Sequence, residues 1–160
     1  MKGHYRPYKK HDISTLADTM CQADLTEIFL SDGLDPLKAL QRACRDSEEI
    51  NTILAPDGEL LGMFGLSNID DITAAPWMLT SGKLQNYYRQ FLRESKQWVI
   101  DANERKPLLL NYVHVDNKNA MLWLKFLGFK FVRLVKEYGV GKAPFYEFVR
   151  MKDVCTSSRC

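Results

Sequence analysis

The stretch from Asn111 to Phe129 constrains the fold more than any other part of the chain. It begins inside an apolar run, 108–115, that is typical of a β-strand. The run stops at 116–119 (Asp-Asn-Lys-Asn), where side chains can accept hydrogen bonds from the free backbone N–H groups of a helix start. Apolar residues then recur at helical spacing, and Gly128 follows the last of them, as is common at a helix C-terminus. The stretch therefore predicts a strand, a capped short helix and a second strand.

The rest of the chain alternates predicted strands and helices. Pro7 restricts the first strand to a sheet edge or a strand end, and Asp12 is predicted to cap the first helix. Gly62 and Gly65 predict a bulge or a close backbone approach within a hairpin. In chain order we expect a strand at 5–8, helices at 12–21, 25–29 and 36–44, a hairpin at 50–66, a strand at 76–80, a helix at 84–99, the unit described above, a polar loop at 136–142 and a last strand at 144–151. This order predicts one α+β, or mixed α/β, domain over residues 1–152, with a flexible tail at 153–160.

Composition argues against several function classes. The 22 basic and 20 acidic residues give a net charge of +2, too small an excess to predict nucleic-acid binding. No apolar run approaches the ~18 residues of a membrane span, and the N-terminus lacks the apolar segment of a secretory signal. The cysteines Cys21, Cys44, Cys155 and Cys160 fit no zinc spacing. We therefore expect no metal site, buried thiols at the first two cysteines and a reducing compartment.

The element order, the Asn-x-x-Ala spacing at 117–120 and the Gly-Phe exit at 128–129 resemble the GNAT superfamily of acetyl-CoA-dependent N-acetyltransferases. The first strand with Arg6-Pro7 and the hairpin at 51–66 are similar to the same parts of that family, so the resemblance covers essentially the whole chain. It implies a mixed sheet splayed between its central strands, with acetyl-CoA in the V-shaped opening. It also implies transfer of an acetyl group to an amine.

A closer resemblance is to GNAT-like proteins of short-tailed bacteriophages, which include acetyltransferases and internal virion proteins. It is carried by the segments 24–27 (Asp-Leu-Thr-Glu), 36–39, 76–80 (Pro-Trp-Met-Leu-Thr), 111–113, 123–124 and 127–129. This resemblance implies acetylation of a protein amine, a host or virion protein as partner, and a location in the host cytoplasm or the virion. The alternative is a non-catalytic module that binds a virion or host protein, and the sequence leaves both open.

The resemblance places acetyl-CoA along the strand at 76–80 and at the starts of the long and short helices. The residues that it assigns to the coenzyme are Met78, Leu79, Thr80, Ser81, Gly82, Lys83, Asn117, Asn119 and Trp123. The family's glycine-rich phosphate loop is reduced here to Gly82, with Lys83 as a point charge near a helix N-terminus. An ordinary helix start capped by Ser81 explains the same residues, and capping alone explains an Asn at 117 or 119.

Acetyl transfer needs a base for the amine, a polarised thioester carbonyl and a route for release of the thiolate. The strand at 76–80 carries no carboxylate, so the candidate catalytic residues are His114, which titrates near neutrality, and Glu27. A structural strand histidine is the alternative for His114, and Glu27 and Asp24 can instead bind the amine or cap a helix turn. The resemblance implies a proton-donating tyrosine at position 124, where this chain has Leu124, which cannot donate a proton.

Overall fold

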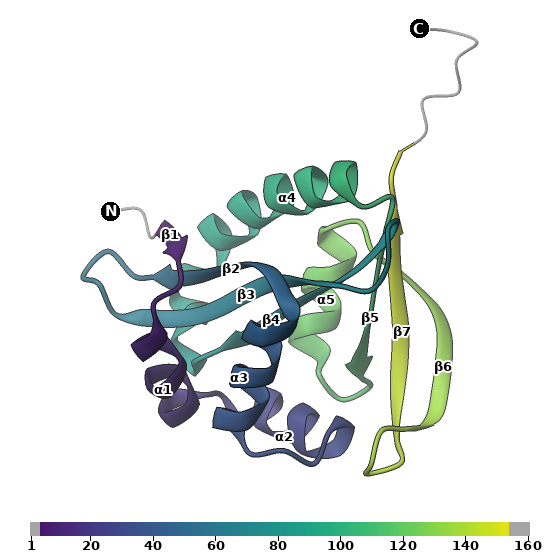
Figure 1. Ribbon diagram of the computed structural model, residues 1–160, viewed down its shortest axis with the longest axis horizontal. Coiled ribbons are helices and arrows are strands. Elements are labelled where there is room, and N and C mark those ends of the chain that lie inside the picture. Colours follow the sequence, from purple (N-terminus) through teal and green to yellow (C-terminus); the bar gives the residue numbers. More distant parts are fainter. Residues whose placement is uncertain (1–3, 154–160) are drawn as a thin grey trace, which may run out of the picture.

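A seven-stranded mixed sheet runs through residues 4–153, the part of the chain that this computed structural model describes (Figure 1). The strands are β1 (His4–Pro7), β2 (Ser47–Leu54), β3 (Leu60–Asn68), β4 (Thr73–Thr80), β5 (Leu108–His114), β6 (Lys130–Tyr138) and β7 (Ala143–Met151). Their order across the sheet is β1-β2-β3-β4-β5-β7-β6, and every neighbouring pair is antiparallel except the central one, β4 with β5. The proline-containing strand β1 lies at an edge, as predicted.

Helices cover both faces of this sheet. They are α1 (Lys10–Thr19), α2 (Gln22–Ser31), α3 (Pro36–Asp46), the 3-10 helix η1 (Gly82–Tyr87), α4 (Tyr88–Arg105) and α5 (Lys118–Phe126). Met63 on β3 is buried among residues of α1, α2 and α3, whereas its neighbour Phe64 is buried against η1 and α4. Because successive side chains of a strand point to opposite faces, α1–α3 lie on one face of the sheet and α4 with α5 on the other.

The two central strands, β4 and β5, separate soon after they begin. They pair in parallel over only two residue pairs, Thr73–Leu108 and Ala74–Leu109. Beyond this short ladder, the side-chain amide of Asn111 on β5 donates to a backbone carbonyl of β4 at 2.9 Å. The predicted splayed mixed sheet is therefore confirmed, and it opens toward the carboxyl ends of the two strands.

The unit at 108–129 folds as its sequence predicts. Asn117 caps α5, because its side-chain oxygen accepts a hydrogen bond from the backbone N–H of Ala120 at 3.3 Å. After the helix, Gly128 has a φ of 91°, and its N–H donates to the carbonyl of Lys125 at 3.1 Å. The following N–H bonds one carbonyl further back, which completes a Schellman motif. This motif requires left-handed backbone, which glycine adopts without strain.

The structure corrects the predicted cap of α1. Lys9 is the N-cap, and Asp12 lies within the first turn with only 1% of its surface exposed. The Asp12 carboxylate accepts from the Lys9 backbone N–H at 2.7 Å, from the Thr52 hydroxyl at 2.8 Å and from both terminal nitrogens of Arg6 at 2.8 and 3.1 Å. A residue type can indicate a cap, but only the positions of β1 and β2 show that this carboxylate joins the helix to the sheet.

Other boundaries also differ from the predicted ones. The long helix is preceded by η1, so α4 begins only at Tyr88, and β4 begins at Thr73. Ser81 occupies the N-cap position of η1, as predicted, but its side chain does not cap the helix, since its hydroxyl donates to the carbonyl of Leu61 at 3.3 Å. The strand β6 continues to Tyr138, which reduces the predicted loop at 136–142 to a turn at 139–142. Edge strands often carry exposed charged residues, and such a strand is hard to tell from a loop by sequence.

The hairpin of β2 and β3 confirms the close approach predicted at its glycines. A Cβ atom added to Gly65 would lie 2.6 Å from the carbonyl oxygen of Glu49 and 2.8 Å from the indole ring of Trp77. At Gly62, the same atom would lie 2.8 Å from the carbonyl oxygen of Leu79. Neither position has room for a side chain, so the neighbouring strand β4 depends on both glycines.

Both described cysteines are free thiols: Cys44 is buried, and Cys21 is partly buried just before α2. Cys155 and Cys160 lie outside the described residues, as does all but the first residue of the predicted tail, so the domain boundary at 152 stays a prediction. Among residues 4–153, no helix is long and apolar enough to cross a membrane, and no group of His, Cys, Asp and Glu side chains has the arrangement of a metal site.

The Asp12 network should make stability depend on pH at its acidic end. Burial alone would raise the pKa of Asp12, but the bonds from Arg6, Lys9 and Thr52 outweigh it and lower the pKa from 3.8 to about 2. A lowered carboxyl pKa gives stability that is present above the unfolded value and lost as pH falls through the folded value. We predict that Asp12→Asn lowers the free energy of unfolding at pH 7 by about 2 kcal/mol in urea titrations.

The difference between wild type and Asp12→Asn should shrink as the pH is lowered from 4 toward about 2. Asp18→Asn, an exposed position on the same helix, is the matched control and should leave the unfolding midpoint nearly unchanged. Equal stability of Asp12→Asn and Asp18→Asn at pH 7 would contradict the role given to this network.

Candidate active site

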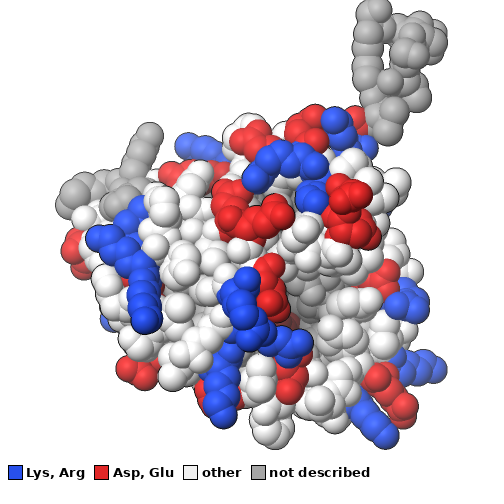
Figure 2. All heavy atoms as spheres, in the orientation of Figure 1, with Lys and Arg blue, Asp and Glu red and all other residues white. Residues whose placement is uncertain are grey.

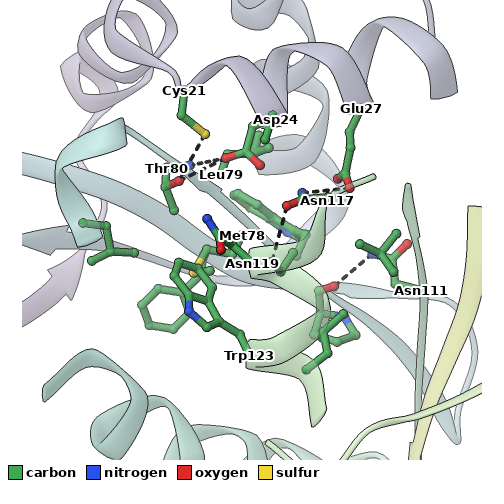
Figure 3. Close-up of a pocket in the computed structure, with 18 of the residues that line it drawn as sticks. Cys21, Asp24, Glu27, Met78, Leu79, Thr80, Asn111, Asn117, Asn119 and Trp123 are labelled. Carbon is green, nitrogen blue, oxygen red and sulfur yellow. Dashed lines mark hydrogen bonds between the residues drawn. The ribbon is translucent and has the colours of Figure 1, made fainter. Parts of the chain in front are cut away.

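A cavity of about 570 Å³ occupies the opening between β4 and β5 (Figure 3). Residues of α2, β4, β5, α4 and α5 line it, with contributions from β6 and β7 at the α2 end. Figure 3 shows that α2 lies along one side of this cavity, that α5 begins beside it at Asn117, and that Trp123 lies further along α5, away from α2. The cavity therefore sits at the only parallel junction in the sheet of the described chain, where two strands end and two helices meet.

Two carboxylates of α2 connect the diverging ends of β4 and β5. Asp24 accepts hydrogen bonds from the backbone N–H of Thr80 at 2.8 Å and from its hydroxyl at 3.1 Å, at the end of β4. Glu27 accepts from the backbone N–H of His114 at 3.0 Å, at the end of β5. Residues three apart on a helix lie on the same face, so one turn of α2 spans the opening.

Glu27 is a buried titratable group that faces the cavity. Its Oε1 accepts from the His114 N–H and also, at 2.9 Å, from the side-chain amide of Asn117, the residue that caps α5. No described residue donates to Oε2, and no buried side-chain oxygen in the described chain lacks a partner, so Oε2 is open to the cavity. Burial raises the pKa of Glu27 from 4.5 to about 7, and the charge of Asp24 adds to the rise, while the bonds from Asn117 and His114 oppose it.

Asp24 has a different environment at the other end of the same helical turn. Burial raises the pKa of its carboxyl above the usual range, although the Thr80 N–H, the Cys21 thiol and the Thr80 hydroxyl all favour the ionised form. The Cys21 sulfur lies 3.5 Å from the Thr80 hydroxyl oxygen, and burial raises the pKa of this thiol as well. A thiol whose pKa is raised is a poor nucleophile, so we give Cys21 no catalytic role. The bonds of Asp24 and of the Cys21 backbone N–H to Thr80 hold the end of β4 in place.

Backbone groups of β4 are exposed along the side that faces β5. The N–H and the carbonyl of Thr80 both bond to the α2 segment at 2.8 Å, and the carbonyl of Pro76 accepts from Asn111. Backbone groups of every second residue point to the same edge of a strand. The N–H and carbonyl of Met78, halfway between these two residues, therefore point into the opening, beyond the reach of the short β4–β5 ladder.

Aromatic rings and an open backbone segment complete the α4 and α5 side of the cavity. Trp123 projects from α5 and packs against Tyr88 and Phe91 of α4, with ring centroids 5.6 Å apart in both pairs. Beyond the end of β4, a Cβ atom added to Gly82 would meet no atom within 4 Å. This corner therefore offers an apolar wall beside uncrowded backbone.

The structure brings together all but one of the predicted coenzyme-binding residues. Those that line the cavity are Met78, Leu79, Thr80, Ser81, Gly82, Asn117, Asn119 and Trp123. Lys83 is the exception: it is exposed, forms an ion pair with Glu59 just before β3, and does not line the cavity. Leu124 does line it, at the position where the family resemblance implies a tyrosine.

The two predicted catalytic residues are adjacent, but they are placed differently. Glu27 lines the cavity, whereas His114 does not. The His114 ring packs against Phe145 with centroids 5.2 Å apart, and the residue is 9% exposed. It contributes to the site through its backbone N–H, which holds Glu27.

Several other residues of the cavity were passed over by sequence reasoning, among them Asn111, Tyr112 and Tyr138. The available signal for Asn111 was a polar amide inside an apolar strand, a position that requires a hydrogen-bond partner when it is buried. Tyr112 and Tyr138 stack on one another with centroids 4.5 Å apart. Their pairing joins β5 to β6, which are not neighbours in the sheet, and no local pattern predicts it.

No family model matches this chain, and no curated protein sequence matches it. Solved structures match it over nearly its whole length. Ard1 from Thermoplasma volcanium has 16% identity and a TM-score of 0.76, covering 96% of this chain and 100% of that one. The chain has the GNAT fold. The predicted α+β fold class and the predicted GNAT-like architecture are thus confirmed.

Two further structures with this fold carry chemical descriptions. Spermidine N-acetyltransferase from Vibrio cholerae, in complex with CoA and spermine, has 13% identity and a TM-score of 0.70, covering 94% of this chain and 96% of that one. A GCN5-related N-acetyltransferase from Kribbella flavida has 15% identity and a TM-score of 0.67, covering 93% and 97%. The TM-scores show that these proteins and the chain share a fold, and at identities this low the likeness extends to the fold alone.

Burial of the Glu27 carboxyl should lower the free energy of unfolding at neutral and alkaline pH. Its carboxyl loses its proton near pH 4.5 in the unfolded chain and near pH 7 in the folded one. Between these values the unfolded chain binds fewer protons, so the free energy of unfolding falls as pH rises through this range. We predict that Glu27→Gln, which keeps both hydrogen bonds to its Oε1, is more stable than wild type at pH 8 by up to about 3 kcal/mol.

Thermal unfolding at pH 5 and pH 8 measures this effect, and the gain in the free energy of unfolding should fall to about 1 kcal/mol or less at pH 5. Glu48→Gln is the charge-matched control, because Glu48 is exposed on β2 away from the cavity. A Glu27→Gln protein that is less stable than wild type at pH 8 would show that the ionised carboxylate is favoured in the fold.

Proposed function

We propose that the chain is an N-acetyltransferase that moves an acetyl group from acetyl-CoA to a primary amine. The observation that carries the proposal is Glu27, a carboxyl with a pKa of about 7 and a free Oε2, in the cavity that the backbone of Met78 also lines. A base that titrates near neutrality is suited to accept a proton from an amine at physiological pH. The GNAT fold supports the same reaction class.

The residues present fit the acyl-pantetheine arm of acetyl-CoA. The arm carries amide groups, which can pair with the exposed backbone N–H and carbonyl of Met78 as an added strand would. Trp123 and Phe91 provide an apolar wall, and Gly82 leaves space beside the backbone at the end of β4. No described Lys, Arg or His lines the cavity to meet the phosphates, and the N–H of Ser81 already donates to the carbonyl of Leu61 at 2.9 Å, so we assign the phosphates to backbone N–H groups from Gly82 onward.

Acetyl-CoA supplies an activated acyl group as a thioester. The chain's own contribution begins with the Met78 N–H, which can polarise the thioester carbonyl by a hydrogen bond directed at the developing negative charge. Glu27 Oε2 accepts the proton that the amine loses as its nitrogen attacks. Asn117 and the His114 N–H hold Glu27 in position through Oε1, and this leaves Oε2 for the amine.

Release of the thiolate needs no acid at position 124. An ordinary thiol has a pKa of about 8.5, so its anion leaves at neutral pH far more readily than an alkoxide would. Leu124 therefore keeps that part of the cavity apolar and donates nothing. We assign the base to Glu27 and a positioning role to the backbone of His114, in place of the imidazole that the sequence suggested.

Acetyl-CoA binding and turnover test this proposal together. Isothermal titration should show binding of acetyl-CoA, and an assay of thiol release should show turnover with a primary alkylamine. Glu27→Gln should keep the binding and lower kcat/KM by about 100-fold or more, the usual contribution of a general base. His114→Ala should retain most of the activity, because its backbone N–H remains.

Absence of both heat and thermal shift with millimolar acetyl-CoA would reject the proposal. Loss of activity in His114→Ala with full activity in Glu27→Gln would instead return the base to the imidazole.

The second candidate is a non-catalytic module that binds a host or virion protein, as the resemblance to bacteriophage proteins suggests. Two observations favour it: Leu124 stands in place of an acid, and Lys83 is paired with Glu59 away from the cavity. If this second function is correct, we expect the chain in the virion or in the host cytoplasm. Its presence in purified particles at a fixed ratio to the capsid protein, without turnover of any amine, would support it. Robust turnover and absence from particles would reject it.

A further inference from the structure

The charged residues that line the cavity all have the same sign. Four carboxylates contribute to it, and no Lys, Arg or His among the described residues does. The carboxylates are Asp24, Glu27, Asp32 and Glu94. The outer surface is different, because Figure 2 shows basic and acidic side chains interspersed over the face in view. The described side chains that line the cavity can therefore contribute negative charge and no positive charge, on a protein with a net charge of +2.

Asp32 is the carboxylate in this set with no structural task for its side chain. Asp24 and Glu27 anchor β4 and β5, and Glu94 accepts a hydrogen bond from Gln90 at 2.8 Å. Asp32 is exposed at the end of α2, where its backbone N–H closes the helix. Its carboxylate forms no hydrogen bond and no ion pair with any described residue, so it is available to a ligand at the cavity mouth.

An aromatic wall stands next to Asp32. Tyr138 stacks on Tyr112 with centroids 4.5 Å apart and meets Phe145 at 4.7 Å, and all three rings line the cavity. The negative charge of Asp32 reaches this wall, because it adds to the effect of burial in raising the pKa of Tyr138. The faces of aromatic rings attract cations, so the ring of Tyr138 and the carboxylate of Asp32 favour the same kind of ligand.

The turn after Tyr138 fixes this arrangement. The N–H groups of Val140 and Gly141 donate to the carbonyls of Ser31 and Leu30 at 3.1 and 2.9 Å, at the end of α2. Gly139 has a φ of 70°, and a Cβ atom there would lie 2.5 Å from the carbonyl oxygen of Ser31. The turn thus sits directly on the α2 backbone, and it holds Tyr138 beside Asp32.

The geometry points to an acceptor with two positive charges. Glu27 and Asp32 are five residues apart, which corresponds to a rise of about 7.5 Å along a helix axis and a rotation of about 140° around it, so we expect their carboxylates to lie at least about this far apart. We propose that the acceptor is an unbranched primary amine with a second cationic group at least about 7 Å from the reacting nitrogen. The reacting nitrogen lies at Glu27, and Asp32 with the Tyr138 ring binds the second charge. This proposal rests on the proposed acetyltransferase function and names the substrate class of the same site.

Two sources can present this chemistry: a free aliphatic diamine, or the α-amino group of a peptide whose first residue is lysine. In both, a carbon chain separates two ammonium groups by a comparable length. The probes are 1,5-diaminopentane against pentylamine, and a Lys-initiated peptide against the same peptide with leucine first. Each pair differs in the second charge and matches closely in length.

Isothermal titration in the presence of CoA measures binding without need of turnover, and the acetylation assay measures KM. The dicationic probe should bind about two- to fivefold more tightly than its monocationic partner, the scale of one exposed charge pair. Asp32→Asn should abolish this preference and leave affinity for the monocation unchanged. Asp18→Asn, an exposed charge removed far from the cavity, should keep the preference. The pair that shows the larger preference identifies the source.

Equal affinity for dication and monocation, or the same preference in Asp32→Asn as in Asp18→Asn, would overturn the inference even if acetylation proceeds. Absence of acetylation with every amine would reject the proposed function separately. In that case the titration still decides whether Asp32 selects a doubly charged ligand.

Discussion

The site depends on one short contact, the turn of α2 that joins the ends of β4 and β5. Two parallel strands that pair over only two residue pairs would leave a row of backbone groups without partners. Asp24 satisfies the end of β4, and Glu27 satisfies the end of β5 and the cap residue of α5. The opening between the strands is thereby held at a fixed width, with the backbone of Met78 left free inside it. These two carboxylates therefore hold the strand ends apart, and one of them, Glu27, is also the proposed base.

The same contact lowers the stability of the fold when Glu27 is ionised, and this loss of stability points to a functional role. A carboxyl that is buried far enough to reach a pKa of about 7 destabilises the fold whenever it is ionised. Glutamine at this position would keep both hydrogen bonds without that penalty, so stability does not explain the glutamate. A base that faces a cavity with an open Oε2 does explain it. Among residues 4–153, no Lys, Arg or His side chain lines the cavity, and this supports the same conclusion because a cationic amine can then supply the counter-charge.

Much of the fold could be predicted because it is encoded locally. Gly128 and Asn117 carry their own turn and cap geometry, and Gly62 with Gly65 marks a close approach of strands. The site was less accessible to such reasoning. The residue type suggested His114, but the side chain that lines the cavity is Glu27, whose bond to His114 joins residues 87 apart in the chain. Likewise, Asp12 and Lys83 have residue types that suggest a cap and a phosphate ligand, and only their tertiary partners show otherwise.

The central claim is that Glu27 is the base, with its titration set by burial between α2 and the strand ends. The dependence of kcat/KM on pH, with an alkylamine acceptor, tests it most directly. The wild-type profile should rise with a midpoint near pH 7, well separated from the amine's own titration at about pH 10. Glu27→Gln should lack that rise at its lower activity. A wild-type profile without a transition near pH 7, or the same transition in Glu27→Gln, would contradict the account.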